Sequence, residues 1–430
     1  MAHSAQNLPS VPQLVQNVVQ RCAALWWDGG SGSEDLGPAY TSDEQVAGEG
    51  QLKRFQDMVA VEAKRAPRTR AQRQATQERI LAAFRAFARV SLGFGETHMD
   101  ALLDQGLPQV GTQFAQTARC FDPTIRGSDI FQAMRNVWTM NCLQMLLGQR
   151  IELTPAVFAY SMLYPYTDNY LDDPAISVES KRAFNERFGR RLQGEDVAPA
   201  NTQERTIYKL VGMIESQFPR RDYTQVFESL YAIHRAQCKS VDLLRRQASP
   251  YEVDVLGISL EKGGTSVLAD GYLVAGTLSE AQAAYVFAWG AFLQFADDLQ
   301  DVEQDTTDGL STVFSQTAGR WPLDAITDRT LHFGRQVVEG LDCFAAPTAE
   351  PVKRLMERST YSLLVEAAGA APHLYTPDYV RQLERHSPFR FAFVKERRRQ
   401  MAGQSAAIMA LVEAFARFDP RDSPPPFPLP

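Results

Sequence analysis

The chain has 430 residues and a formal net charge of −7, from 44 Lys and Arg against 51 Asp and Glu. This length allows one large domain or two of medium size, and a composition with 44% hydrophobic and 22% charged residues is that of an ordinary globular protein. The acidic balance argues against a nucleic acid as the main partner, because affinity for a phosphate backbone comes from an excess of Lys and Arg.

The cysteines and the longest apolar run limit where the protein can reside. Five cysteines lie far apart, without a CxxC pair or a histidine cluster that would complete a zinc site, so we expect a reduced, cytoplasmic protein. The N-terminus lacks the basic and then apolar segments of a signal peptide. The longest apolar run, residues 281–296, is shorter than the roughly 20 residues that cross a bilayer, so it predicts a buried helix and no transmembrane segment.

Apolar residues recur at helical spacing along most of the chain, and no comparable strand pattern is found. A first helix is expected over residues 11–27, followed by a Gly/Ser-rich loop and a charged stretch over residues 51–90. That stretch holds a basic run typical of a solvated helical face or its connecting loop: Lys64, Arg65, Arg68, Arg70 and Arg73. Further helices are predicted over residues 130–147, 155–172, 208–218, 226–244, 265–275, 281–301 and 406–418.

This pattern predicts an all-α protein with one large helical domain over residues 81–420. A looser N-terminal extension, partly helical or flexible, is expected over residues 1–80. The proline-rich tail over residues 421–430 cannot be helical, and we expect it to be either disordered or draped on the surface.

Two of the predicted helices end in carboxylates. The helix over residues 155–172 carries Asp168 and Asp172, which share a face because four residues advance an α-helix by about 6 Å and turn it only about 40° past a full turn. The helix over residues 281–301 leads into Asp297, Asp301 and Asp305, which follow the same spacing and form one stripe.

Such stripes predict a metal site. Carboxylates at this spacing repel each other by about 0.2–0.5 kcal/mol per exposed pair, and by more when they are desolvated. Mg²⁺ supplies the missing positive charge, since it prefers oxygen ligands and binds one or two carboxylates together with phosphate oxygens. Two facing stripes would hold two or three Mg²⁺ ions that bind a diphosphate. A solvated helix end is the alternative for either stripe alone.

The segments DNYLDD and FLQFADDLQDVEQD resemble the two aspartate-rich motifs of class I isoprenoid enzymes, the superfamily of trans-prenyl diphosphate synthases, squalene and phytoene synthases and class I terpene synthases. The segment EKGGTSVLADGYLVAG resembles the Lys-Thr stretch that faces the diphosphate in prenyl synthases. The resemblance covers roughly residues 94–315 and implies a helical bundle around a central active-site cavity. It also implies that the acids of both motifs bind the metal ions: Asp168, Asp172, Asp173, Asp297, Asp298, Asp301 and Asp305.

The catalytic acids implied by the resemblance are Asp168, Asp172, Asp297 and Asp301. Lys262 and Thr265 are implied as contacts of the diphosphate. Apart from the resemblance, Gly263 and Gly264 predict a helix break followed by an N-cap at Thr265, where free N–H groups would favour an anion. A plain turn between helices is the alternative.

Arginine and aromatic side chains complete the candidate site. Guanidinium groups bind phosphate bidentately, and the candidates are Arg135, which interrupts an apolar helix face, and Arg182, which follows the first motif. Tyr164, Trp289 and Phe292 lie within a few turns of the aspartates. Their rings either stabilise a carbocation, by up to about 2 kcal/mol when desolvated, or simply pack the core.

The sequence favours a Mg²⁺-dependent terpene synthase that ionises an allylic prenyl diphosphate. A prenyltransferase, by chain elongation or head-to-head coupling, is the second interpretation, although the GKxxRP-like segment that helps prenyl synthases bind isopentenyl diphosphate is missing. A helical scaffold without catalytic activity, whose acidic patches bind a basic partner, is the third. A homodimer is compatible with all three interpretations.

Overall fold

A computed structural model describes residues 10–29, 36–37, 39–65, 67–91, 99, 103–173, 175–244, 253–402, 405–417 and 424–430. Over these residues the chain is built of helices without a strand, which confirms the predicted all-α class. Within the same ranges, no helix combines the length and the apolar character needed to cross a membrane.

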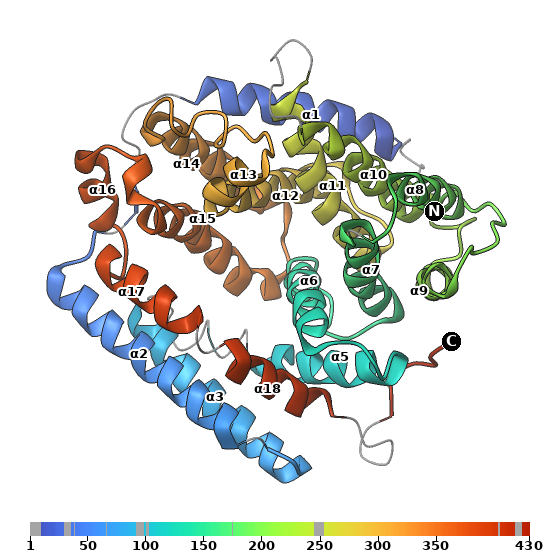
Figure 1. Cartoon of the computed structure of the whole chain (residues 1–430), viewed down its shortest axis with the longest axis horizontal. Helices are drawn as coiled ribbons and strands as arrows, with labels where there is room; N and C mark the ends of the chain where they lie inside the picture. The colour runs from blue at the N-terminus through green and yellow to red at the C-terminus, as the bar shows by residue number, and fades with distance from the viewer. Residues whose placement is uncertain are drawn as a thin grey trace.

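The helices follow one another along the chain with mostly short connections (Figure 1). The first half contains α1 (Val11–Asp28), α2 (Ser42–Arg65), α3 (Arg70–Ser91), α5 (Leu107–Phe121), α6 (Gly127–Leu146), α7 (Pro155–Asp172), α8 (Val178–Leu192), α9 (Thr202–Gln217) and α10 (Thr224–Ser240). The second half contains α11 (Val255–Ala275), α12 (Glu280–Gln300), α13 (Val302–Asp308), α14 (Asp324–Glu339), α15 (Glu350–Ala370), α16 (Pro377–Glu384), α17 (Phe391–Ala402) and α18 (Ser405–Ala416).

Local signals in the sequence set the ends of the two helices that carry the acidic motifs. Helix α7 begins at Pro155, whose fixed φ suits a first turn, and the Thr154 hydroxyl accepts the N–H of Val157 at 3.2 Å. Helix α12 begins with a capping box, in which Ser279 and Gln282 satisfy each other's backbone N–H groups. The predicted bounds of α7 are therefore confirmed, and those of α12 agree to within one residue.

Helices α11 and α12 form the centre of the core, and α1, α10, α14 and α15 pack around them (Figure 1). Helix α1 lies within the segment expected to be a looser extension, yet its apolar face is buried in this core, with Val11 and Trp26 almost inaccessible to solvent. The main core therefore begins with α1. The predicted N-terminal segment also contains α2 and the first half of α3, and these two helices pack against each other as a hairpin.

Helix α11 runs without interruption through Gly263 and Gly264, so the predicted break and the N-cap at Thr265 are wrong. These glycines permit close packing with α12. A Cβ on Gly263 would lie 2.5 Å from the carbonyl oxygen of Gly290, and a Cβ on Gly264 would lie 2.3 Å from the Phe287 ring. The two backbones can approach this closely only because no side chain separates them.

We expect Gly290→Ala to lower the free energy of unfolding by about 3 kcal/mol, because its Cβ would lie 2.3 Å from the carbonyl oxygen of Gly263, which the helix holds in place. Gly212→Ala on α9 is the matched control. Its Cβ would meet nothing within 4 Å, so replacing a mid-helix glycine there should raise stability by about 0.5–1 kcal/mol. Urea unfolding followed by circular dichroism measures the free energy of unfolding of both variants. Equal changes in Gly290→Ala and Gly212→Ala would contradict the packing argument.

The proline-rich tail lies on the protein surface over residues 424–430 and is not helical there, as predicted. The ring of Phe427 packs against the buried ring of Phe158, with 5.7 Å between the centroids. Residues 421–423 of the predicted tail lie outside the described residues.

Candidate functional site

The second acidic stripe lies where α12 ends and α13 begins. The N–H of Asp301 donates to the carbonyl oxygen of Asp297 at 3.0 Å, and the N–H of Asp305 donates to that of Asp301 at 2.8 Å. These bonds span four residues each, so the chain keeps its helical path across the junction. Asp297, Asp301 and Asp305 therefore follow one another at intervals of about one helical turn, as predicted.

Two carboxyl groups of this region are buried without full compensation. Burial raises the pKa of Asp298 to about 7, and raises that of Asp305 to about 6 with the charges of Asp301 and Asp297 adding to the effect. Oδ1 of Asp298 accepts a hydrogen bond from Nε2 of Gln294 at 2.7 Å, whereas its Oδ2 has no hydrogen-bond partner among the described residues. An unpartnered buried oxygen of this kind suits a cation.

The side chain of Asp297 combines solvent exposure with partial desolvation. Its side chain is exposed to solvent, yet desolvation is the main cause of its raised pKa, followed by the charge of Asp301. A ligand can therefore reach this carboxylate, and its partial desolvation makes charges interact with it more strongly than in bulk water.

Two positive side chains from other helices lie close to the stripe. Lys262 of α11 and Arg135 of α6 both act against the rise in the pKa of Asp297, and Lys262 has the same effect on Asp298 and Asp305. The structure thus brings together three helices at Asp297. Both basic residues were predicted to contact a diphosphate, and both lie where an anion held by this stripe would be bound.

The first acidic motif reaches the same face of α11. The hydroxyl of Tyr164 lies 2.7 Å from Oγ of Ser266, which stands one helical turn beyond Lys262. The charge of Asp168, one turn further along α7, contributes to the raised pKa of Tyr164. Tyr164 and Asp168 therefore lie on the side of α7 that faces α11. The side chain of Asp172 lies outside the described residues.

Behind Tyr164 lies a buried polar network that the sequence analysis missed. Asp270 of α11 is 1% exposed, and its Oδ1 accepts a hydrogen bond from Nδ2 of Asn136 at 3.1 Å. Asn136 also donates to Oγ of Ser161 at 3.2 Å. Burial raises the pKa of Asp270 well above its ordinary value. The sequence did contain a signal for this buried acid, because Asp270 stands within the apolar segment SVLADGYLVAG. It follows Lys262 by eight residues and so lies on the same helix face.

Two predicted residues lie apart from this arrangement. Asp173 follows the end of α7, where its carboxylate accepts the N–H of Ala175 at 2.8 Å, and it lines a groove with Asp122 and Tyr166. Five residues turn a helix by about 140°, so this is a different side of α7 from that of Asp168. Arg182 is exposed on α8, where it interacts electrostatically with Glu179.

Three further candidates are packed in the core. The hydroxyl of Thr265 is fully buried and donates to the carbonyl oxygen of Glu261 at 2.7 Å, so it caps no helix. Phe292 is fully buried against Gly334 of α14. Trp289 is also buried, with its ring 5.4 Å from that of Phe292. For the two aromatic residues, packing of the core is the role that these contacts support.

The acids present fit Mg²⁺ by their chemistry, because the stripe offers only carboxylate oxygens. Among the described residues, no group of three or more His, Cys, Asp and Glu side chains converges as a preformed metal site. Two features of the stripe suit a cation. Asp298 Oδ2 is buried without a hydrogen-bond partner among the described residues, and the carboxylates of Asp297, Asp301 and Asp305 repel each other, which a bound cation would relieve.

Comparison with known proteins gives no family for this chain: no family model and no curated protein matches it. The likeness of the two motifs to class I isoprenoid enzymes therefore stays an expectation, and the function has to be argued from the geometry of the residues.

Proposed function

We propose that this protein is a Mg²⁺-dependent class I terpene synthase. It would ionise an allylic prenyl diphosphate, after which the cation cyclises, loses a proton or captures water. The observation that carries the proposal is the acidic stripe at the end of α12, which holds desolvated carboxylates and has Lys262 and Arg135 beside it. Carboxylates for a cation and basic groups for an anion, placed together, are what a metal-bound diphosphate requires.

The proposed roles follow from position. Asp297, Asp301 and Asp305, with Asp298 beside them, would hold the metal ions, and Asp168 on α7 would do so from the opposite side. When bound, Mg²⁺ neutralises the charge that develops on the leaving diphosphate. Lys262 and Arg135 bind diphosphate oxygens and hold the leaving group in place.

The substrate's hydrocarbon chain would lie along α7 and α11. Tyr164, Ser266 and Asn136 are only partly buried although each belongs to a helix of the core, and Ser266 stands one helical turn beyond Lys262. The Tyr164 ring lies 5.5 Å from that of Tyr160, and both rings offer electron-rich surface to a carbocation. The hydroxyl of Tyr164 is held by Ser266, which fixes the orientation of its ring.

A single prenyl diphosphate with Mg²⁺ should suffice for turnover. We expect pyrophosphate and a hydrocarbon or alcohol of unchanged carbon number, and isopentenyl diphosphate should not accelerate the reaction. Elongation needs a second basic cluster near the stripe, but Arg70 and Arg73 belong to α3, which lies at the lower left edge of Figure 1, whereas α12 and α13 lie near its centre. Incubation with C10 to C25 prenyl diphosphates and mass spectrometry measures this. Products longer by five carbons would favour a prenyltransferase.

The non-catalytic scaffold makes a different prediction that needs no turnover. A protein that binds Mg²⁺ and pyrophosphate at one site gains stability from the two together, by several kcal/mol at concentrations well above the dissociation constant. A scaffold should show no joint effect. The melting temperature with Mg²⁺ alone, with pyrophosphate alone and with both distinguishes the two interpretations.

A further inference from the structure

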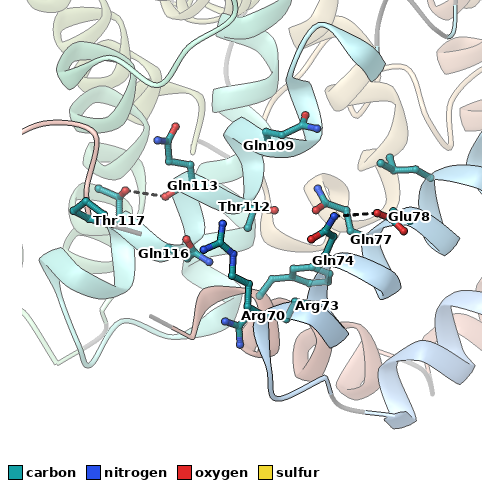
Figure 2. A pocket seen from close by; sticks show the side chains of 13 residues that line it. Arg70, Arg73, Gln74, Gln77, Glu78, Gln109, Thr112, Gln113, Gln116 and Thr117 are labelled. Atoms are coloured by element: carbon teal, nitrogen blue, oxygen red, sulfur yellow. Dashed lines mark hydrogen bonds between the residues drawn. The ribbon is translucent and has the colours of Figure 1, made fainter. Parts of the chain in front are cut away.

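A cleft of about 470 Å³ lies between α3, α5 and α18, apart from the acidic stripe (Figure 2). Arg70 and Arg73 project into it from the first turn of α3. Leu81 of α3 and Phe415 of α18 add apolar surface. Its volume is within the range of sites that bind small molecules, about 300–1,000 Å³. The proposed terpene synthase activity makes no use of this cleft.

The charge around the cleft is opposite to that of the protein as a whole. Residues 64–73 include five basic side chains and no acid, in a chain whose net charge is −7. Arg65 is partly neutralised by Glu62, at 2.6 Å, but Glu62 does not line the cleft. The acid among the lining residues is Glu78, which accepts a hydrogen bond from Nε2 of Gln74 at 3.2 Å. Among the described residues that line the cleft, two guanidinium groups stand against one carboxylate.

The wall opposite the arginines consists of neutral groups that donate and accept hydrogen bonds. It is formed by α5 and contains Gln109, Thr112, Gln113, Gln116 and Thr117 (Figure 2). Gln77 of α3 joins the two walls, because its Nε2 donates to the carbonyl oxygen of Pro108 at 3.1 Å. On the other side, Nη1 of Arg73 donates to the carbonyl oxygen of Arg68 at 3.0 Å and ties that side chain to the hairpin. The cleft therefore has a charged end and a polar uncharged wall, both held by hydrogen bonds.

We propose that this cleft binds a small phosphate ester, with Arg70 and Arg73 on the phosphate group and the amides of α5 on the body of the ligand. A guanidinium offers paired N–H groups that match two phosphate oxygens, and two of them match the two charges of a phosphate monoester. Amide side chains suit hydroxyl or amide groups on the rest of the molecule, because each amide both donates and accepts. The same chemistry is found in a soluble ester and in the headgroup of a phosphomonoester lipid.

Titration calorimetry in EDTA tests the proposal with glycerol phosphate and inorganic phosphate as probes. Without a metal ion the carboxylates around Asp297 repel anions, so binding there does not interfere. We expect Arg70→Gln with Arg73→Gln to weaken binding of both probes at least tenfold. Lys53→Gln with Arg54→Gln is the matched control: it removes the same charge from exposed positions of α2 and should leave binding unchanged. Gln113→Leu should weaken the binding of glycerol phosphate and leave the binding of inorganic phosphate unchanged.

The outcomes show whether the phosphate group that binds belongs to a soluble ester or to a lipid headgroup. Saturable binding of glycerol phosphate that requires both arginines supports a soluble ester. Binding only to vesicles that contain a phosphomonoester lipid, again lost with Arg70 and Arg73, supports a headgroup. An equal loss in the Lys53 and Arg54 control, or no binding of any probe, would overturn the proposal. None of these results depends on whether the protein ionises a prenyl diphosphate, so this proposal and the terpene synthase proposal can fail separately.

Discussion

Asp297→Asn should abolish pyrophosphate release from a prenyl diphosphate, with a loss of at least about 100-fold, while the protein stays folded. The substitution keeps the shape of the side chain but removes the charge that would hold a metal ion beside Lys262. Because Asp297 is exposed and its pKa is raised, losing the carboxylate removes repulsion from Asp301 and should not destabilise the native state. Pyrophosphate release is measured by a coupled assay, and helical content by circular dichroism.

Glu303→Gln is the control for this prediction. Glu303 belongs to α13 and lies two residues from Asp301, but its carboxylate contacts His373 at 3.1 Å and is not part of the stripe. Its loss should leave turnover within about twofold of the wild type. Near wild-type turnover of Asp297→Asn, with Glu303→Gln unaffected, would remove the acidic stripe from the proposed mechanism.

In EDTA we expect the free energy of unfolding of the wild type, relative to that of Asp298→Asn, to fall as the pH rises from about 4 to about 7. Buried His234, whose pKa is lowered to about 4 by desolvation, contributes an opposite trend to both proteins. The pKa of Asp298 is about 7 in the native state and that of Asp305 is about 6, against about 4 in an unfolded chain. Between these values the unfolded chain loses its protons first, so rising pH favours unfolding. For Asp298 the change is on the order of 4 kcal/mol, and above pH 7 no more stability is lost through this group.

Mg²⁺ with pyrophosphate should reverse this trend, because a metal binds the deprotonated carboxylates. The rise in melting temperature on adding both should therefore be larger at pH 8 than at pH 5. Asp298→Asn should flatten the pH dependence in EDTA, whereas Glu303→Gln should leave it in place. The same pH dependence of the melting temperature in the wild type and in Asp298→Asn would show that Asp298 is not desolvated in the native protein.

Local signals predicted the helices that carry the acids, whereas long-range packing decided the features that were missed. Pro155 and Ser279 act within a few residues, so the starts of α7 and α12 could be read from the sequence. A pair of glycines permits either a helix break or a close helix contact, and only the presence of Gly290 across from Gly263 decides between them. No pattern in the segment around Gly263 contains that information.

The candidate site, like the fold, could be predicted only in part from the sequence. The spacing of Asp297, Asp301 and Asp305 follows from helix geometry alone. Arg135 was a candidate because a guanidinium group on an apolar helix face suggests an anion, whereas Lys262 was implied only by the resemblance to prenyl synthases. The buried carboxyl of Asp270 could not be placed, because its partner Asn136 is 134 residues away along the chain. Nor could the sequence show that Phe292 and Thr265 are turned into the core. Helical periodicity predicts that one face of a helix is buried, but it does not show which other helix covers that face.

The glycine contact between α11 and α12 determines which parts of the molecule can move. Since the two backbones touch at Gly263 and Gly290, Lys262 and the acids of α12 must shift together as one rigid unit. Helix α7 is joined to α11 at Tyr164 by a contact between two hydroxyl groups, which can separate and re-form at little cost. Any widening that admits a substrate between the two motifs should therefore come from a displacement of α7, with α11 and α12 acting as the fixed frame.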